Sequence, residues 1–494
     1  MIINTPMIIT FTIYLFAMMA IGWIGYRATD NLSDYILGGR SLGSFVTALS
    51  AGASDMSGWL LMGLPGAVFL NGISEAWIAV GLAIGAWLNW TFVAGRLRIY
   101  TEKCSNALTL PEYFSKRFED NSNILRMVTA VVILVFFTIY CASGVVAGAR
   151  LFENMFGFSY QIALWIGALA TIAYVLIGGF LAVSWTDTVQ ASLMFTALLM
   201  VPLMVIYHND GVSSSIAYVE STKPAALNMV NHLDFIAIIS LLAWGLGYFG
   251  QPHILVRFMA ADSVKSIPAA RRISMTWMII CLLGAVSVGF FGMVYYSIHP
   301  SMSTAVNNNA ETVFIELSKQ LFNPWLAGIF LAAILAAVMS TLSCQLLVCS
   351  SALTEDIYKT FFRKQASQHE LVWIGRAMVL LVAVIAIILA LDPESKVLKM
   401  VSYAWAGFGA AFGPVIILSL IWSRMNKNGA LAGIITGALT VLIWKQYALF
   451  GLYEIIPGFL LSSIAVIIVS LLTEAPSAQM LLTHQEVRIE LNKK

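Results

Sequence analysis

The sequence predicts an all-α polytopic membrane protein with about 13 transmembrane helices. The 494-residue chain is 60% hydrophobic and only 11% charged, and its mean hydropathy of +0.85 lies outside the range of ordinary soluble domains. Charge-free apolar runs long enough to cross a bilayer as helices recur along the whole chain. The net charge of +2 is scattered between these runs, so we expect no nucleic-acid partner.

The apolar runs define the spans in chain order. The first is expected to be retained, because no basic region precedes it and no small-residue cleavage site follows it. The spans are expected at residues 7–26, 43–70, 76–95, 127–149, 157–177, 188–207, 235–256, 273–298, 320–350, 377–391, 400–423, 428–446 and 455–473. We therefore expect a single transmembrane transporter domain over residues 1–473 and a short cytoplasmic tail over 474–494.

Basic residues gather in three loops that fall on one side of the predicted membrane domain. Loops that stay in the cytoplasm are enriched in Lys and Arg, so this side is expected to be cytoplasmic. The amino terminus would then lie outside and the carboxyl terminus inside. The three groups are Arg96, Arg98, Lys103, Lys116, Arg117 and Arg126; Arg257, Lys265, Arg271 and Arg272; and Lys359, Arg363, Lys364 and Arg376.

Asp55 is the outstanding candidate functional residue. It lies near the middle of the second span, and no other charge occurs between Ser41 and Ser74. An ionisable group in a transmembrane helix is costly and usually faces the bundle interior, where it serves a function. A carboxyl group that is protonated or hydrogen-bonded between helices is the alternative. We favour coordination of a cation.

Glycine and proline interrupt two of the predicted spans. Such residues weaken a continuous helix and free backbone carbonyls, which suit a hard cation such as sodium. The interruptions are Gly52, Gly58, Gly63, Pro65 and Gly66 in the second span, and residues 244–252 (WGLGYFGQP) in the seventh. Two interrupted spans in corresponding places point to inverted repeats, here spans 2–6 and 7–11. Close helix packing is the alternative for the seventh span.

The ninth span places small and hydroxyl side chains on one helical face. The spacing of three and four aligns Ala333, Ala337, Ser340, Thr341 and Cys344. Hydroxyl oxygens on this face suit either ion binding or helix packing, and the spacing alone does not decide between them. The presence of Asp55 favours ion binding.

Aromatic residues within the spans are candidates for the wall of a pocket for a small amphipathic solute. They are Trp59, Tyr140, Trp244 and Tyr248, each of which core packing would also explain. Arg40 and Asp187 lie at predicted cytoplasmic ends of spans and are gate candidates, although boundary charges often only snorkel to water.

Catalytic and nucleotide-binding motifs are not found in a credible context, so we expect no enzyme activity and no cofactor. Active transport would then draw on an ion gradient. The five cysteines are odd in number, and four lie inside apolar runs, so we expect no disulfide framework. Nothing in the sequence indicates an obligate protein partner.

Three motifs resemble the sodium:solute symporter family. They are residues 34–40 (DYILGGR), the segment around Asp55, and residues 178–182 (GGFLA). The resemblance runs along nearly the whole chain and is closest over 38–72, 136–150 and 178–190. It implies a leucine-transporter-type core of two inverted five-helix repeats, with one span before it and two after. It also implies sodium-coupled import of L-proline across a bacterial cytoplasmic membrane by alternating access.

The resemblance further implies site residues at matching positions. For sodium binding and coupling it implies Ala53 and Met56 through their carbonyls, Ala337, the hydroxyls of Ser340 and Thr341, and Asp55. For the substrate it implies Ser57, Trp59, Gly63, Tyr140, Cys141, Trp244, Tyr248 and Pro252. Three rivals remain: a symporter of the family for another small solute, such as pantothenate, a short carboxylate or a sugar; a sensory membrane module; and a channel.

Overall fold

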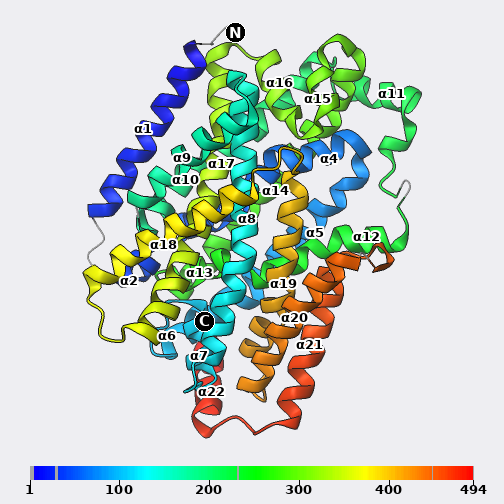
Figure 1. Ribbon diagram of the computed structural model, residues 1–494. Coiled ribbons are helices and arrows are strands. Elements are labelled where there is room, and N and C mark those ends of the chain that lie inside the picture. The colour runs from blue at the N-terminus through cyan, green and yellow to red at the C-terminus, as the bar shows by residue number, and fades with distance from the viewer. Residues whose placement is uncertain (1–4, 28–31, 178, 231–232, 448, 493–494) are drawn as a thin grey trace.

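The computed structural model describes residues 5–27, 32–177, 179–230, 233–447 and 449–492, and it consists almost entirely of helices (Figure 1). The one pairing of extended segments among these residues is a bridge between Leu42 and Ala261. Gly178 of the third motif and the last two residues of the predicted tail lie outside the described residues. The predicted all-α class is confirmed.

Ten helical stretches in the described residues are long and apolar enough to cross a membrane. They are α1 (Thr5–Arg27), η3 to α6 (Ile73–Lys103), α8 (Ile124–Phe156), α10 (Phe180–His208), η7 with α14 (Val264–Ile298), α17 with η10 (Pro324–Phe362), α18 (Gln368–Leu389), α19 (Val397–Ile421), α20 (Lys427–Tyr447) and α21 (Ile455–Leu472). Their subdivisions are η3 (Ile73–Glu75), α5 (Ala76–Leu88), η4 (Asn89–Ala94), α6 (Gly95–Lys103), η7 (Val264–Ser266), α14 (Ile267–Ile298), α17 (Pro324–Ser351) and η10 (Ala352–Phe362).

Three further predicted spans are bent, broken or short. The seventh consists of α12 (Phe235–Leu242), η6 (Ala243–Gly250) and α13 (Pro252–Ala260), with a bend of 44° before α13. The second consists of α3 (Ser44–Asp55), η2 (Trp59–Gly63) and α4 (Leu64–Asn71), and the fifth is α9 (Tyr160–Ile177). The predicted count of spans is therefore approximate, but every predicted range falls on helix.

The predicted start of the sixth span at residue 188 was wrong. Helix α10 begins at Phe180, so Asp187 lies two turns inside the helix and is fully buried. The apolar-run criterion stopped at this aspartate because it treats any charge as a boundary.

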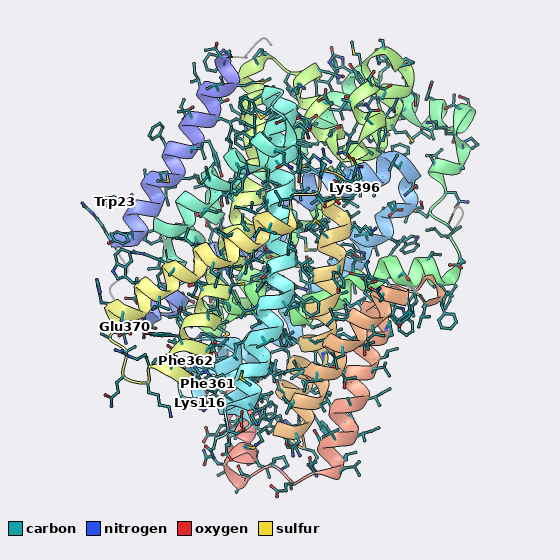
Figure 2. The ribbon with its side chains drawn as sticks, viewed as in Figure 1. Trp23, Lys116, Phe361, Phe362, Glu370 and Lys396 are labelled. Atoms are coloured by element: carbon teal, nitrogen blue, oxygen red, sulfur yellow. The ribbon has the colours of Figure 1, made fainter. Side chains whose placement is uncertain are left out.

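The remaining helices lie at the two ends of the bundle (Figure 1). On the end that carries the amino terminus are α11 (Val212–Thr222), α15 (Thr304–Asn308), η9 (Ala310–Thr312) and α16 (Val313–Leu321). Toward the other end are α2 (Leu32–Leu37), η1 (Gly38–Arg40), α7 (Leu110–Arg117) and α22 (Ala478–Asn492). Figure 2 shows Lys396 toward the first end and Lys116 toward the second.

Both interrupted spans lie in the middle of the bundle. Helix α3 packs against α10, α13, α14 and α17, while η6 packs between α5 and α19. Glycine allows backbones to touch here: a β-carbon on Gly85 would lie 2.1 Å from the carbonyl oxygen of Gly245, and one on Gly245 would lie 2.2 Å from that of Gly81. Close backbone contact between helices is typical of membrane bundles, where small residues make the interface.

The predicted tail forms helix α22, which packs against α6. Lys103 forms ion pairs with Glu486 and Glu490, at 3.3 and 3.4 Å. The division into a domain over 1–473 and a tail over 474–494 stays a prediction.

Candidate functional site

The break in the second span frees two backbone carbonyls. Helix α3 ends at Asp55, and Met56 has the non-helical angles φ −83° and ψ 84°. The amide of Ser57 donates to the carbonyl of Asp55 at 3.0 Å instead of that of Ala53, and the amide of Leu60 donates to the carbonyl of Ser57, also at 3.0 Å, instead of that of Met56. The carbonyls of Ala53 and Met56 have therefore lost their α-helical donors.

Gly58 allows this break to approach α8 closely. A β-carbon there would lie 2.6 Å from the β-carbon of Ala147, which is too close for any other residue without a shift. The glycine-rich composition of the span thus has a packing cause as well as a conformational one.

The hydroxyl face of α17 meets the break. Thr341 Oγ1 donates to the carbonyl of Ala53 at 3.4 Å, which joins the second and ninth spans directly. Ser340 Oγ donates instead to Asp187 Oδ1, at 2.9 Å. Ala337 is fully buried one turn earlier on the same helix. One of the two freed carbonyls, that of Ala53, therefore meets a hydroxyl of this face.

The Asp55 carboxylate joins the two interrupted spans. It is only 2% exposed, and its Oδ2 atom accepts a hydrogen bond from the hydroxyl of Tyr248 in η6. Its Oδ1 atom is buried and has no hydrogen-bond partner among the described residues. Buried carboxylate oxygens are normally paired, so this oxygen is suited to a cation.

Aromatic side chains gather around the backbone of Asp55. The carbonyl of Asp55 accepts from Trp59 Nε1 at 3.1 Å and from the Tyr140 hydroxyl at 3.3 Å. The rings of Trp59 and Trp244 are 6.3 Å apart. The structure therefore brings together Trp59, Tyr140, Trp244 and Tyr248, which come from three separate spans.

A cavity of about 550 Å³ is lined by Trp244, one of these aromatic residues, and by Asn307 and Asn308 of α15. Gly63, Glu311 and Leu398 line it as well. The carboxylate of Glu311 accepts from the amides of Val397 and Leu398, both at 3.2 Å, and so caps the start of α19. Burial raises the pKa of Glu311.

Three other predicted substrate residues make few or none of the contacts described around Asp55. Ser57 lies in the break, where its hydroxyl accepts from the amide of Trp59 at 3.5 Å. Cys141 and Pro252 are buried on α8 and α13. Neither makes one of the hydrogen bonds or ring contacts described around Asp55.

Trp405 was missed by the sequence analysis. Its Nε1 donates to the carbonyl of Trp244 at 2.7 Å, and its ring lies 5.2 Å from that of Tyr248. It carries the same signal as the chosen residues, an aromatic side chain inside a span. Its role depends on which face of α19 meets η6, and the sequence does not give that face.

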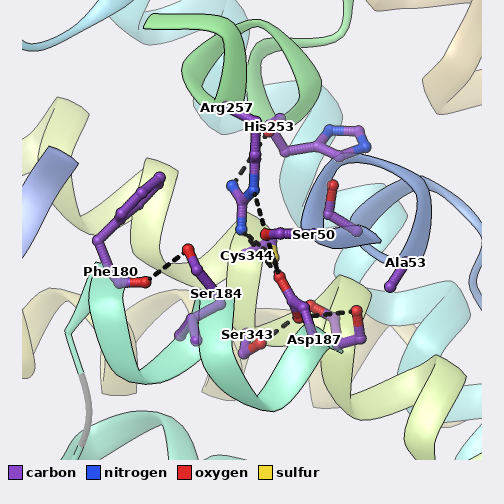
Figure 3. Close-up of polar contacts among 12 residues, drawn as sticks. Ser50, Ala53, Phe180, Ser184, Asp187, His253, Arg257, Ser343 and Cys344 are labelled. Carbon is purple, nitrogen blue, oxygen red and sulfur yellow. Dashed lines mark hydrogen bonds and ion pairs between the residues drawn. The ribbon is translucent and has the colours of Figure 1, made fainter. Parts of the chain in front are cut away.

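Asp187 forms the centre of a second buried polar group (Figure 3). It accepts from Ser50 Oγ at 2.6 Å and from Ser340 Oγ at 2.9 Å, and it forms an ion pair with Arg257 at 3.4 Å. Asp187 and Arg257 are fully buried. The interpretation of Asp187 as a charge at a span boundary was wrong, and so was that of Arg257 as a loop residue, because Arg257 lies inside α13.

Arg40, the last residue of η1, connects this helix to two other parts of the bundle. Its guanidinium donates to Asn106 Oδ1 at 2.7 Å, to the carbonyl of Ala107 at 2.9 Å and to that of Met259 at 2.5 Å. Burial and the neighbouring Arg98 lower the pKa of Arg40 to about 10. No direct contact with the other gate candidate, Asp187, is present in the described part of the chain.

Comparisons with known proteins agree with this geometry. The model of the family described as "Sodium:solute symporter family" matches residues 35–437. The sodium/proline symporter of Escherichia coli (strain K12) is 68% identical, over 97% of this chain and 96% of that protein. The high-affinity proline transporter PutP of Bacillus subtilis (strain 168) is 54% identical, over 93% of this chain and 97% of its own length.

A solved structure shares the fold. A sodium-coupled sialic acid symporter, in a substrate-bound outward-open state, superposes with a TM-score of 0.82 over 96% of this chain and 99% of that one, at 19% identity. The predicted leucine-transporter-type core is confirmed by this likeness. With the family model matching most of its length, the chain belongs to the sodium:solute symporter family.

Proposed function

We propose that this multi-pass membrane protein imports L-proline by sodium-coupled symport. The observation that carries the proposal is the break at residues 56–57, which deprives two carbonyls of their helical donors and leaves that of Ala53 against Thr341 of α17. Discontinuous helices that meet at the middle of a bundle are the usual binding sites of secondary transporters. The choice of proline rests on the names of the relatives, which are those of proline transporters. The sequence match to these relatives covers nearly their whole length.

Sodium would bind between α3 and α17. The ligands would be the carbonyls of Ala53 and Met56 and the hydroxyls of Ser340 and Thr341, with Ala337 beside them. Sodium is a hard cation that prefers oxygen ligands, and carbonyls and hydroxyls supply them without a full charge. The unpartnered Oδ1 of Asp55 lies next to this position in the chain and supplies negative charge.

Proline would bind among the aromatic residues beside the sodium. Trp59, Tyr140, Trp244 and Tyr248 provide flat apolar surfaces that suit a pyrrolidine ring, together with polar tips. The other members of the proposed pocket are Ser57, Gly63, Cys141 and Pro252. The substrate would reach them through the cavity of about 550 Å³ lined by Gly63 and Trp244.

Coupling between sodium and proline would follow from the residues that their two proposed sites share. Bound sodium would hold the break of the second span against α17, and the same break carries Trp59 and the Tyr140 contact of the substrate pocket. Sodium would then raise the affinity for proline, and by linkage proline would raise that for sodium by the same factor. Entry of the positive charge releases about 2.3 kcal/mol per 100 mV of membrane potential, in addition to the sodium concentration ratio.

Arg40 and Asp187 would act on the cytoplasmic side of the site. Asp187 accepts a hydrogen bond from Ser340, a proposed sodium ligand, so a change at either residue reaches the other. Arg40 would hold the inner end closed through its bonds to the carbonyls of Ala107 and Met259. In the bacterial cytoplasmic membrane the amino terminus would face outside and the carboxyl terminus the cytoplasm.

Uptake of labelled L-proline into proteoliposomes tests the function. An inward sodium gradient is expected to drive accumulation that a sodium ionophore abolishes, and a potassium gradient is the control. Folded protein that accumulates no proline would contradict the substrate assignment and direct the assay to other small solutes. Flux that does not saturate would favour a channel instead.

Asp55→Asn tests the role of the carboxylate in the same assay. The amide keeps an acceptor for Tyr248 but removes the negative charge, so sodium-dependent uptake is expected to fall by at least about tenfold, or about 1.4 kcal/mol. Asp210→Asn is the matched control, because Asp210 is exposed and lies outside the bundle. Normal uptake by Asp55→Asn at unchanged sodium dependence would rule out this role.

A further inference from the structure

Two adjoining cavities lie beside the far end of α19, away from the proposed transport site. One has a volume of about 210 Å³ and lies between α6, the end of α19 and α22. The other has a volume of about 240 Å³ and lies between α5, η4 and α19. Leu420 and Ile421 line both, so the two cavities are neighbours at this end of α19.

The first cavity is basic. Arg96, His484 and Arg488 line it. The nearest carboxylates of α22, Glu486 and Glu490, form ion pairs with Lys103 instead. Within the described residues, neither Arg96 nor Arg488 forms an ion pair with a carboxylate, so no carboxylate of this part of the chain neutralises the positive charge that faces the cavity.

A further buried cation lies behind the cavity. Arg117 is 2% exposed, and its Nη1 and Nη2 atoms have no hydrogen-bond partner among the described residues. Its guanidinium lies 5.0 Å from the centre of the Tyr100 ring, and the Tyr100 hydroxyl is hydrogen-bonded to His484. Burial lowers the pKa of His484, and the positive charges of Arg117 and Arg488 lower it further.

The second cavity is apolar. Its wall consists of Leu88, Phe92, Val93, Phe249 and Ile417, together with the two shared residues. Phe92 and Ile421 are about half exposed on the outer surface of the bundle, so the cavity borders the region that lipid chains occupy. Arg96 follows Phe92 by one helical turn and donates to its carbonyl at 2.8 Å, so the basic cavity begins where the apolar one ends.

We infer that the two cavities together bind one anionic phospholipid. The phosphate would lie between Arg96 and Arg488, and one acyl chain would follow Phe92 and Ile417. Basic pockets between membrane helices on the cytoplasmic side are suited to such headgroups, and an apolar channel that starts at the same place suits the attached chain. A free phosphate ion would use only the first cavity.

Occupancy by the lipid has a consequence for transport. The acyl chain would touch Phe249, and the preceding residue, Tyr248, donates its hydroxyl to Asp55. A bound lipid would therefore contact η6 directly beside Tyr248, a residue of the proposed substrate pocket. This inference does not depend on which solute is carried.

Native mass spectrometry of the full-length chain in detergent tests the site. The purified protein is titrated with phosphatidylglycerol and, separately, with phosphatidylcholine of the same acyl chains. One phosphatidylglycerol is expected to bind more tightly than phosphatidylcholine, by about fivefold for each arginine that faces the headgroup. Equal binding of the two lipids would overturn the inference.

Variants separate this site from general surface charge. Arg96→Gln/Arg488→Gln is expected to remove the preference, whereas Lys265→Gln/Lys364→Gln removes two exposed basic residues of the same predicted side and should preserve it. The single variant Arg488→Gln, on the exposed face of α22, serves if the double variant does not fold. Ile421→Gln is expected to weaken binding of the lipid through its acyl chain.

A competition arm distinguishes a lipid from a simple anion site. Inorganic phosphate in excess is expected to leave the bound phosphatidylglycerol in place, because it does not fill the apolar cavity. Displacement by phosphate, or a preference that persists in Arg96→Gln/Arg488→Gln, would contradict a lipid site here. These outcomes are independent of proline uptake, so a failure of the transport proposal would be seen separately.

Discussion

At the scale of single residues, the buried ion pair between Asp187 and Arg257 is the most consequential contact. Both side chains are fully buried, and the pair joins α10 to α13. The carboxylate also accepts from Ser50 on α3 and Ser340 on α17. Four helices of the core therefore meet at one carboxylate.

Removal of one member of this pair is expected to be worse than removal of both. Arg257→Met leaves a buried carboxylate without its counterion and should lower stability by about 3–5 kcal/mol. Asp187→Asn/Arg257→Met should recover most of that loss, because no net charge remains inside. Thermal unfolding in detergent measures the stability of both variants.

Arg363→Met is the control for this experiment. Arg363 also pairs with a carboxylate, Glu370, at 3.4 Å, but its side chain is 61% exposed, so the loss should be small. A single variant Arg257→Met as stable as the parent would show that the pair does not matter for the fold.

Sequence patterns placed Asp55 in the interior correctly and misplaced Asp187. Asp55 stands alone in a long apolar run, so its position in the interior is readable from its neighbours. Asp187 and Arg257 lie where apolar runs end, and their partners come from helices far away in the chain. Only the packing of those helices shows that they are interior residues and not boundary charges.

At the scale of helices, the interruption of the second and seventh spans was predictable and its contacts were not. Glycine and proline in a membrane span indicate a break from local chemistry alone. Which carbonyls lose their donors depends on the amides of Ser57 and Leu60, whose turn conformation the sequence does not specify. The same holds for Trp405, which is visible as an aromatic residue but not as a neighbour of Tyr248.

The close packing of η6 against α5 can be tested by substitution of a glycine at the contact. Gly245→Ala places a methyl group against the backbone of Gly81, so the helices must separate, and a loss of about 1–3 kcal/mol is expected. The temperature of unfolding in detergent and the rate of proline uptake should both decline. The shift would also displace Trp244, next to the substituted residue.

Gly43→Ala is the matched control. A β-carbon on Gly43 meets nothing within 4 Å, and its φ of −65° suits any residue. Its stability should match that of the parent. If Gly245→Ala were equally harmless, the backbone contact between η6 and α5 would not be tight in the working protein.

At the scale of the whole molecule, the orientation in the membrane is a prediction that labelling can test. All five native cysteines are buried and free, so an introduced surface thiol would be labelled against a low background. Lys364→Cys is expected to react with a membrane-impermeant reagent only after the cells are opened, and Ser213→Cys in intact cells. Both positions are exposed.

The reverse pattern of labelling would place the amino terminus in the cytoplasm. It would also reverse the side from which the cavity near Glu311 is reached. The sequence predicts orientation only through its basic residues, and several of these are now assigned elsewhere: Arg257, Arg117 and Arg98 are buried and act within the protein. Labelling therefore tests an inference that rests on fewer charges than the sequence suggested.

The carbonyls of Ala53 and Met56 limit how mutation can change the proposed sodium site. They belong to the main chain, so no point mutation deletes them, whichever side chain is substituted. Such a mutation would remove them from the proposed sodium site only by letting residues 53–60 wind into a continuous helix. Mutations at this part of the protein would therefore act on the proposed site through the glycines and neighbours that keep the chain broken, such as Gly58 against Ala147.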